Sequence, residues 1–151
     1  MKQSLRKQLS PHFMLYEFTR SGVAIENDLD NTPNAQQTAA LKALCDNILE
    51  PLRLHFGPIV ISSGFRSQKV NRLVGGVPSS QHMKGEAADI VVGDKARATA
   101  MFDFIRRHLD FDQLIWEPVG AANPRWLHVS YTTKRKNRGM VLGGRCFPAH
   151  R

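Results

Sequence analysis

The sequence lacks any apolar run that could cross a membrane, and its first residues lack the pattern of a secretory leader. No stretch of roughly 18 consecutive apolar residues occurs, and residues 1–13 carry charges without a following apolar segment of signal-peptide length. These absences predict a protein that is made in the cytoplasm without a transmembrane segment.

Cysteine is scarce as well. Cys45 and Cys146 are the only two, and neither belongs to a CxxC pair, which excludes a disulfide framework. Cys45 falls on the apolar side of an expected helix, where a free thiol behaves as a small core residue. Cys146 lies in a polar tail, so neither thiol is predicted to be a metal ligand or a nucleophile.

The chain does contain enough apolar sequence for one core. Its 151 residues, 42% of them apolar, predict a single domain over residues 1–151, with a core at about 13–143 and a basic C-terminal tail. We expect a monomer.

The net charge of +8 predicts attraction to nucleic acid, anionic lipid or an anionic cell wall. A solvated basic face that aids solubility is an equal alternative. Much of the excess lies near the ends, in Lys2, Arg6, Lys7, Lys134, Arg135, Lys136, Arg138, Arg145 and Arg151.

Hydrophobic periodicity predicts a mixture of helices and strands. Helices are expected over residues 32–56, 67–73 and 94–109, and strands over 59–61, 87–92, 113–116 and 126–131. Thr32 is expected to cap the first helix with Pro33 at its first position, while Pro51 kinks or shortens it. Because the order shows no regular βαβ repeat, we predict an α+β fold, with a small and mostly antiparallel sheet flanked by helices.

The densest polar cluster of the chain lies at residues 80–90. His82 and Asp89 stand seven positions apart on either side of Gly85. Asp89 is the informative residue, because it interrupts an apolar strand where an unpaired carboxylate is costly to bury. A metal ion would supply the positive partner. Taken singly, a capping aspartate and a hydrogen-bonded histidine are the commoner explanations.

A third candidate ligand, His128, interrupts the apolar strand at 126–131. Strand alternation places Trp126, His128 and Ser130 on one face. Two imidazole nitrogens and one carboxylate oxygen suit a catalytic zinc ion, which keeps a fourth position open for water. We therefore predict one zinc ion bound by His82, Asp89 and His128. The remaining histidines are expected to be packed or surface groups: His12, His55, His108 and His150.

Several short motifs occur in an order that is specific as a set. They comprise residues 62–67, Asn71 with 74–76, residues 80–89, 113–117 and 126–130. Together they resemble the superfamily of zinc D-Ala-D-Ala carboxypeptidases and peptidoglycan endolysins, which also contains VanX-type D,D-dipeptidases and the Hedgehog domain. Within it, the chain most resembles small phage or prophage peptidases. The resemblance covers about residues 13–143 and implies a Hedgehog/DD-peptidase-like fold.

The resemblance also implies an activity. The chain would be a zinc metallopeptidase that hydrolyses an amide bond of peptidoglycan stem peptides by metal-activated water, as a D,D- or L,D-carboxypeptidase or an endopeptidase. Carried over by motif, Arg66 would bind the substrate carboxylate or stabilise the oxyanion. Ser80 would hydrogen-bond near the site or orient the substrate. Without a leader, the protein would reach the cell wall by holin-type release or lysis.

The general base departs from the VanX-type pattern. Those enzymes place a glutamate three residues before the last ligand, where this chain has Arg125. Glu117, at the end of the neighbouring strand, is the predicted replacement, and an exposed strand-end charge is the alternative. Glu86 is a poorer candidate that could simply be solvated.

Two rival functions follow from these features. The missing glutamate before His128 is compatible with a weak or inactive zinc-binding domain that binds cell-wall peptides. The basic cluster at 134–136 is compatible with a nucleic-acid-binding protein, although no recognised nucleic-acid motif accompanies the charge. No specific nucleic-acid partner is therefore expected.

Overall fold

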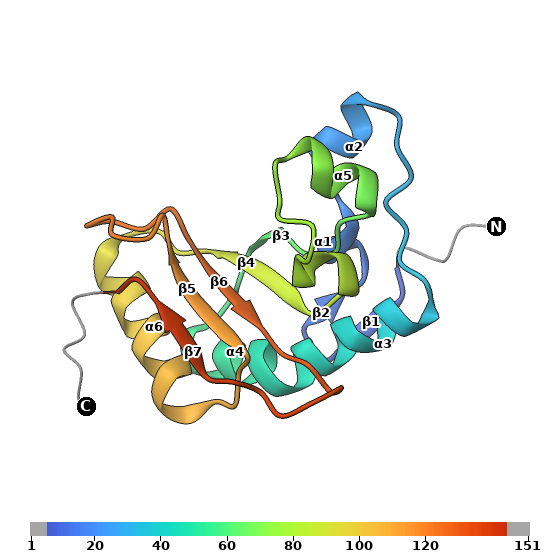
Figure 1. The fold of residues 1–151 in the computed structure, drawn as a ribbon. Coiled ribbons are helices and arrows are strands. Elements are labelled where there is room, and N and C mark those ends of the chain that lie inside the picture. The colour runs from blue at the N-terminus through green and yellow to red at the C-terminus, as the bar shows by residue number, and fades with distance from the viewer. Residues whose placement is uncertain (1–5, 145–151) are drawn as a thin grey trace.

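A computed structural model of the chain describes residues 6–144, and a five-stranded sheet forms its centre (Figure 1). The strand order is β3-β4-β6-β5-β7, and a two-stranded β1-β2 sheet lies apart from it. The large sheet contains β3 (Ile61–Ser63), β4 (Ala87–Val91), β5 (Gln113–Glu117), β6 (Trp126–Ser130) and β7 (Met140–Leu142), and the small one β1 (Gln8–Ser10) and β2 (Phe13–Met14). All pairs are antiparallel except β5 with β7. The predicted α+β class with a mostly antiparallel sheet is confirmed.

Helices occupy two regions around the large sheet. The longer ones are α3 (Ala35–Leu44), α4 (Glu50–Phe56) and α6 (Lys95–His108), and the short ones are α1 (Tyr16–Thr19), α2 (Gly22–Glu26) and α5 (Gln68–Leu73). Figure 1 shows α4 and α6 along one face of the sheet, while α1, α2 and α5 gather beyond its β3 end. A 3₁₀ turn, η2 (Gln81–Lys84), joins this second group to β4. None of the helices in residues 6–144 has both the length and the apolar character needed to cross a membrane.

The first long helix begins later than the sequence predicts. Asn34, not Thr32, is its cap: the Asn34 side chain accepts from the Gln37 amide, and the Gln37 side chain accepts from the Asn34 amide, both at 2.8 Å. This reciprocal capping box satisfies two amides that the helix start leaves unpaired. Thr32 instead donates its hydroxyl to Asp30, so the expected Thr32 cap was wrong.

Pro51 neither ends this helical run nor shortens it. A π-helical segment, η1 (Cys45–Leu49), joins α3 directly to α4. Proline lacks an amide donor, and its ring crowds the carbonyl four residues earlier, here that of Asn47. The wider turn of a π helix relieves this crowding. The helix therefore continues, and Cys45 is buried within it as expected.

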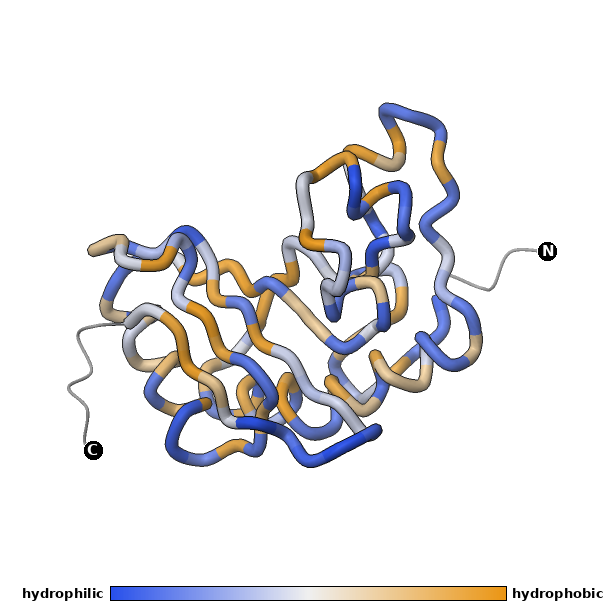
Figure 2. Tube along the Cα trace, in the orientation of Figure 1, coloured by the Kyte–Doolittle hydropathy of each residue, from blue (hydrophilic) through white to orange (hydrophobic). Residues whose placement is uncertain are grey.

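The core lies between the large sheet and the longer helices. In β6, Leu127 and Val129 are fully buried, whereas Trp126 and His128 on the opposite face are partly exposed. Figure 2 shows hydrophobic and hydrophilic residues alternating along the central strands. The predicted apolar stripe of α6 is confirmed as core, in Ala98, Met101, Phe102 and Ile105. The outer face of the sheet is thereby left free to carry polar side chains.

Candidate metal centre

The structure brings His82, Asp89 and His128 together on the outer face of the sheet. Asp89 in β4 and His128 in β6 stand directly opposite each other in the ladder, and His82 is carried by η2. Oδ1 of Asp89 lies 3.0 Å from Nδ1 of His128 and 3.3 Å from Nε2 of His82. One donor atom from each residue falls within 4.8 Å of the other two.

These distances fit a single zinc ion. Ligand atoms at about 2.0–2.1 Å from a tetrahedral zinc are separated from one another by about 3.3 Å. The two Asp89 contacts, 3.0 Å and 3.3 Å, agree with that separation. Two imidazole nitrogens and one carboxylate oxygen also form a typical catalytic zinc set, with one position left for water.

Local structure at η2 orients His82. The Ser80 side chain accepts from the His82 amide at 3.1 Å and so caps the turn. The carbonyl of Gly64 lies 2.7 Å from Nδ1 of the His82 ring. Because a carbonyl can only accept, Nδ1 donates to it, and Nε2 is the ring nitrogen that faces Asp89. Ser80 thus hydrogen-bonds to the backbone of a candidate ligand.

Gly85 ends η2 in a conformation that other residues rarely adopt. Its φ is +74°, and a Cβ at this position would collide with the carbonyl of Gln37 in α3. The Gln37 side chain also donates to the carbonyl of Met83. The ligand-bearing turn is therefore packed tightly against α3.

Asp89 is the electrostatic centre of the site. Burial opposes its ionisation, but hydrogen bonds from His128 and His82 outweigh this and hold its pKa well below the usual range. The carboxylate is therefore ionised. Its Oδ1 faces the two imidazoles, whereas its Oδ2 lies 3.6 Å from Nη2 of Arg66.

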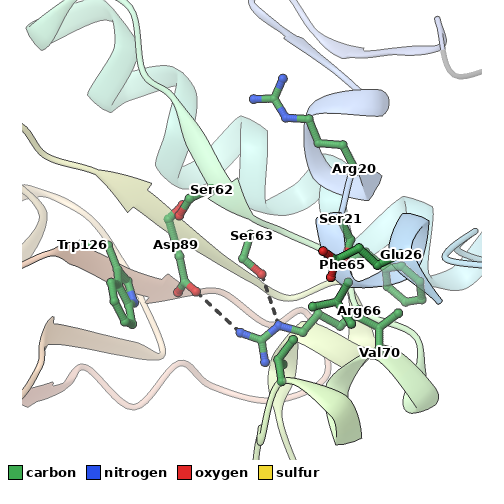
Figure 3. Close-up of a pocket in the computed structure, with 13 residues that line it drawn as sticks. Arg20, Ser21, Glu26, Ser62, Ser63, Phe65, Arg66, Val70, Asp89 and Trp126 are labelled. Atoms are coloured by element: carbon green, nitrogen blue, oxygen red, sulfur yellow. Dashed lines mark hydrogen bonds and ion pairs between the residues drawn. The ribbon is translucent and has the colours of Figure 1, made fainter. Parts of the chain in front are cut away.

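Arg66 is held in a fixed position beside this carboxylate (Figure 3). Its Nε donates to Oγ of Ser63 at 3.1 Å, and its Nη1 donates to Oδ1 of Asn71 at 2.9 Å. Burial lowers the pKa of Arg66, and the charge of Asp89 acts in the opposite direction. A Cβ at Gly76 would lie 2.8 Å from Nη1, so only glycine allows this close packing.

Two hollows meet at Arg66, Asp89 and Trp126. The first, about 410 Å³, is lined by all three candidate ligands together with Ser80, Glu117 and Arg138. The second, about 560 Å³, extends towards α2 and α5 past Arg20 and Glu26 (Figure 3). The candidate metal centre therefore lies in the wall of a continuous cleft.

Glu117 lies in the same hollow as the candidate ligands. Within the ladder, Ile115 of β5 stands opposite His128, and Glu117 stands opposite Trp126. Glu117 is half-buried at the end of β5. Arg125, which occupies the VanX-type glutamate position, is exposed and donates its backbone amide to the carbonyl of Glu117 at 2.7 Å.

Glu86 differs from its expected solvated state. Its side chain is only 4% exposed, and it accepts hydrogen bonds from Thr132 at 3.0 Å and from Gln81 at 3.1 Å. The expectation was wrong because Glu86 is buried between two polar partners, Gln81 in η2 and Thr132 just after β6. Glu86 anchors the loops around the sheet.

The basic segment after β6 is also more ordered than the sequence indicates. Arg135 and Arg138 both bind Asp112, whose side chain is fully buried. The alternative of a purely solvated basic face is therefore wrong for these two arginines. No sequence signal distinguished them from their neighbours, since the pairing partner lies more than twenty positions away.

The other histidines in the described part of the chain lie elsewhere. His12 pairs with Glu50 at 2.7 Å, His55 stacks on Phe104, and His108 ends α6. Within residues 6–144, His82, Asp89 and His128 form the one group with metal-binding geometry. Five residues named from the sequence lie outside the described residues: Lys2, Arg145, Cys146, His150 and Arg151.

Sequence comparison gives a result that agrees with this geometry. A profile of the family described as Peptidase M15 matches residues 11–130. The matched segment contains the three candidate ligands as well as Arg66 and Glu117. No curated protein matches the chain.

Proposed function

Because the chain belongs to the Peptidase M15 family of zinc peptidases, we propose that it hydrolyses an amide bond of peptidoglycan stem peptides with a zinc ion held by His82, Asp89 and His128. The observation that carries this proposal is the convergence of two imidazole nitrogens on one Asp89 oxygen at 3.0 Å and 3.3 Å, in the wall of an open cleft. A cleft open on one side of the ligands leaves room for water and a peptide.

The surrounding residues supply the remaining chemistry. When bound at such a site, zinc acts as a Lewis acid and makes water a usable nucleophile near neutral pH. Glu117, in the same hollow, takes the proton of the attacking water and passes it to the leaving amine. Arg66, fixed by Ser63 and Asn71, donates to the oxygen that becomes negative as the carbonyl carbon turns tetrahedral.

Glu117→Gln tests the proposed base. We expect kcat to fall by about 100-fold or more, with zinc content unchanged, because Glu117 is not among the candidate ligands. Mass spectrometry of digested muropeptides measures turnover and identifies the bond that is cut, and elemental analysis measures zinc. Asp110→Asn, which removes an exposed carboxylate near β5, should leave both unchanged.

A binding module without activity is the second candidate function. Arg125 at the VanX-type glutamate position favours it. A zinc-loaded wild type that binds muropeptides but releases no product would establish this alternative. Turnover that persists unchanged in Glu117→Gln would instead exclude Glu117 as the base.

A further inference from the structure

Arg138 lines the same hollow as the candidate metal ligands, yet it lies beyond the residues that match the family profile. The segment that carries it is fastened beside the start of β5. The amide of Gly139 donates to the carbonyl of Phe111, and the amide of Met140 donates to that of Asp112, each at 2.9 Å. The position of Arg138 is therefore fixed by backbone pairing.

A buried carboxylate fixes the guanidinium of Arg138 as well. Oδ1 of Asp112 accepts from the backbone amide of Arg138 at 3.0 Å and from its Nε at 3.1 Å, and Oδ2 accepts from its Nη2 at 2.7 Å. Arg135 donates Nη1 and Nη2 to the same two oxygens at 2.6 Å and 3.1 Å. One carboxylate thus pairs with two guanidinium groups, so the cluster of Asp112, Arg135 and Arg138 keeps a net positive charge.

The two arginines differ in what they leave free. Arg135 uses both terminal nitrogens on Asp112. Arg138 instead contacts Asp112 through Nε and Nη2. Its Nη1 group therefore has no acceptor within the part of the chain that the structure describes. The Arg138 side chain is 43% exposed. A guanidinium already held in place loses little conformational entropy when it binds a second anion.

The position of Arg138 along β5 suits an extended substrate. Gln113, Ile115 and Glu117 of β5 line the hollow together, and Ile115 stands opposite His128. Gln113 lies two positions before Ile115 along the strand, at a distance of about 7 Å. Arg138 is fastened next to the Gln113 end, so the proposed base and this cation lie at opposite ends of the strand. From a reacting carbonyl beside Ile115, a substrate carboxylate one or two residues further along the peptide reaches the Gln113 end, where Arg138 lies.

We propose that Arg138 binds a carboxylate of the peptide substrate and thereby selects which peptides are cleaved. The pairing is a charge-assisted hydrogen bond, for which the planar guanidinium is well suited. The proposal rests on the proposed function, since it assigns a substrate contact in that same cleft.

Arg138→Ala and Arg135→Ala form a matched pair for the test. Each removes one arginine from Asp112, and their side chains are similarly exposed, at 43% and 47%. Only Arg138 lines the hollow of the candidate ligands. The substrates are a stem peptide with free carboxylates at its C-terminus and at its D-glutamate, and two derivatives in which one or the other is a carboxamide.

For Arg138→Ala we expect kcat/KM on the free peptide to fall by about tenfold or more, mainly through a higher KM. One of the two carboxamides should abolish this difference and so identify the carboxylate that Arg138 binds. Arg135→Ala should stay within about twofold of the wild type on all three peptides. Equal losses on all three peptides, or equal losses in both variants, would overturn the proposal.

Binding measurements separate this inference from the proposed function. Calorimetric titration of zinc-loaded Glu117→Gln with the same peptides should give a Kd about tenfold lower than in Glu117→Gln/Arg138→Ala. If the wild type cleaves none of the peptides but this difference holds, the proposed activity fails and the carboxylate site stands. If cleavage occurs and neither measurement depends on Arg138, the carboxylate site alone is refuted.

Discussion

At the scale of single residues, Asp112 organises a surface that is merely basic in sequence. Its carboxylate is fully buried and accepts hydrogen bonds from two arginines that the chain supplies 23 and 26 positions later. Burial opposes its ionisation, but these hydrogen bonds outweigh that cost and hold the pKa of Asp112 well below its usual range. Folding therefore favours the charged carboxylate.

This pKa shift predicts a pH dependence of stability. As pH falls, the unfolded chain takes up the Asp112 proton first, near pH 4, so the stabilisation is complete above that pH and is lost below it. At pH 7 we expect Asp112→Asn to lower the free energy of unfolding by about 2 kcal/mol. Urea unfolding measured from pH 7 downwards should show the difference from wild type shrinking as pH falls through about 4.

Asp110→Asn is the control for this experiment, because Asp110 is an exposed carboxylate two residues away. It should show little difference from wild type at any pH. A gap between wild type and Asp112→Asn that stays constant into acid would mean that hydrogen bonds alone, and not the ionisation of Asp112, stabilise the cluster.

At the residue level, the useful signal was a polar side chain that is costly to leave unpaired, and the structure does bring the side chains so chosen together. Asp89 and His128 interrupt apolar strands, and that conflict with burial identified them before any geometry was known. Arg138 offered no such conflict, because an arginine in a polar tail is satisfied by water. Only the structure shows that Arg138 is held in place, because it shows that its partner Asp112 is buried.

At the scale of elements, the turn that carries His82 depends on Gly85. Gly75 and Gly85 have nearly the same φ, +76° and +74°, but a Cβ would meet open space at Gly75 and the Gln37 carbonyl at Gly85. The two glycines therefore separate the cost of backbone conformation from the cost of a collision. They form a natural pair for mutation.

Gly85→Ala should destabilise the protein more than Gly75→Ala does. Both variants bear the left-handed conformation, at about 1 kcal/mol, but only Gly85→Ala must also move η2 away from α3. We expect a lower melting temperature and weaker zinc binding for Gly85→Ala, measured by thermal unfolding and metal titration. If the two variants match in both respects, the packing of η2 on α3 does not position His82.

Helices and strands with a clear hydrophobic period were predicted best. The amphipathic α6 and the alternating β5 and β6 were located within a few residues, as was the short helix α5. The strand expected at 59–61 is instead β3 at Ile61–Ser63, and its pairing with β4 contains a register shift between Ile61 and Ser63. Strands of two or three residues, such as β1, β2 and β7, are too short to show a period.

At the scale of the whole molecule, the candidate site joins two groups of elements. His82 is carried by η2, next to α3 and α5, whereas Asp89 and His128 belong to the large sheet. An ion bound by all three would link these groups. Metal binding should therefore contribute to the stability of the entire fold.

Metal removal is expected to lower the melting temperature. At a free zinc concentration 100 times Kd, binding stabilises the folded state by about 2.7 kcal/mol, which corresponds to about 5–10 °C for a chain of this size. Thermal unfolding with and without a chelator measures this. His128→Ala should unfold at the same temperature in both conditions, whereas His12→Ala, which changes a surface pair with Glu50, should retain the shift. Wild-type protein indifferent to the chelator would contradict a structural contribution from zinc.

The position of β7 determines where this domain can be truncated or fused to another protein. The family match stops at residue 130, but β5 acquires its outer neighbour only when Met140–Leu142 returns alongside it. A fragment cut at the end of the match would expose β5 as a bare edge and leave the charge of Asp112 uncompensated. The working boundary of the unit therefore lies past Leu142, and homology alone would place it too early.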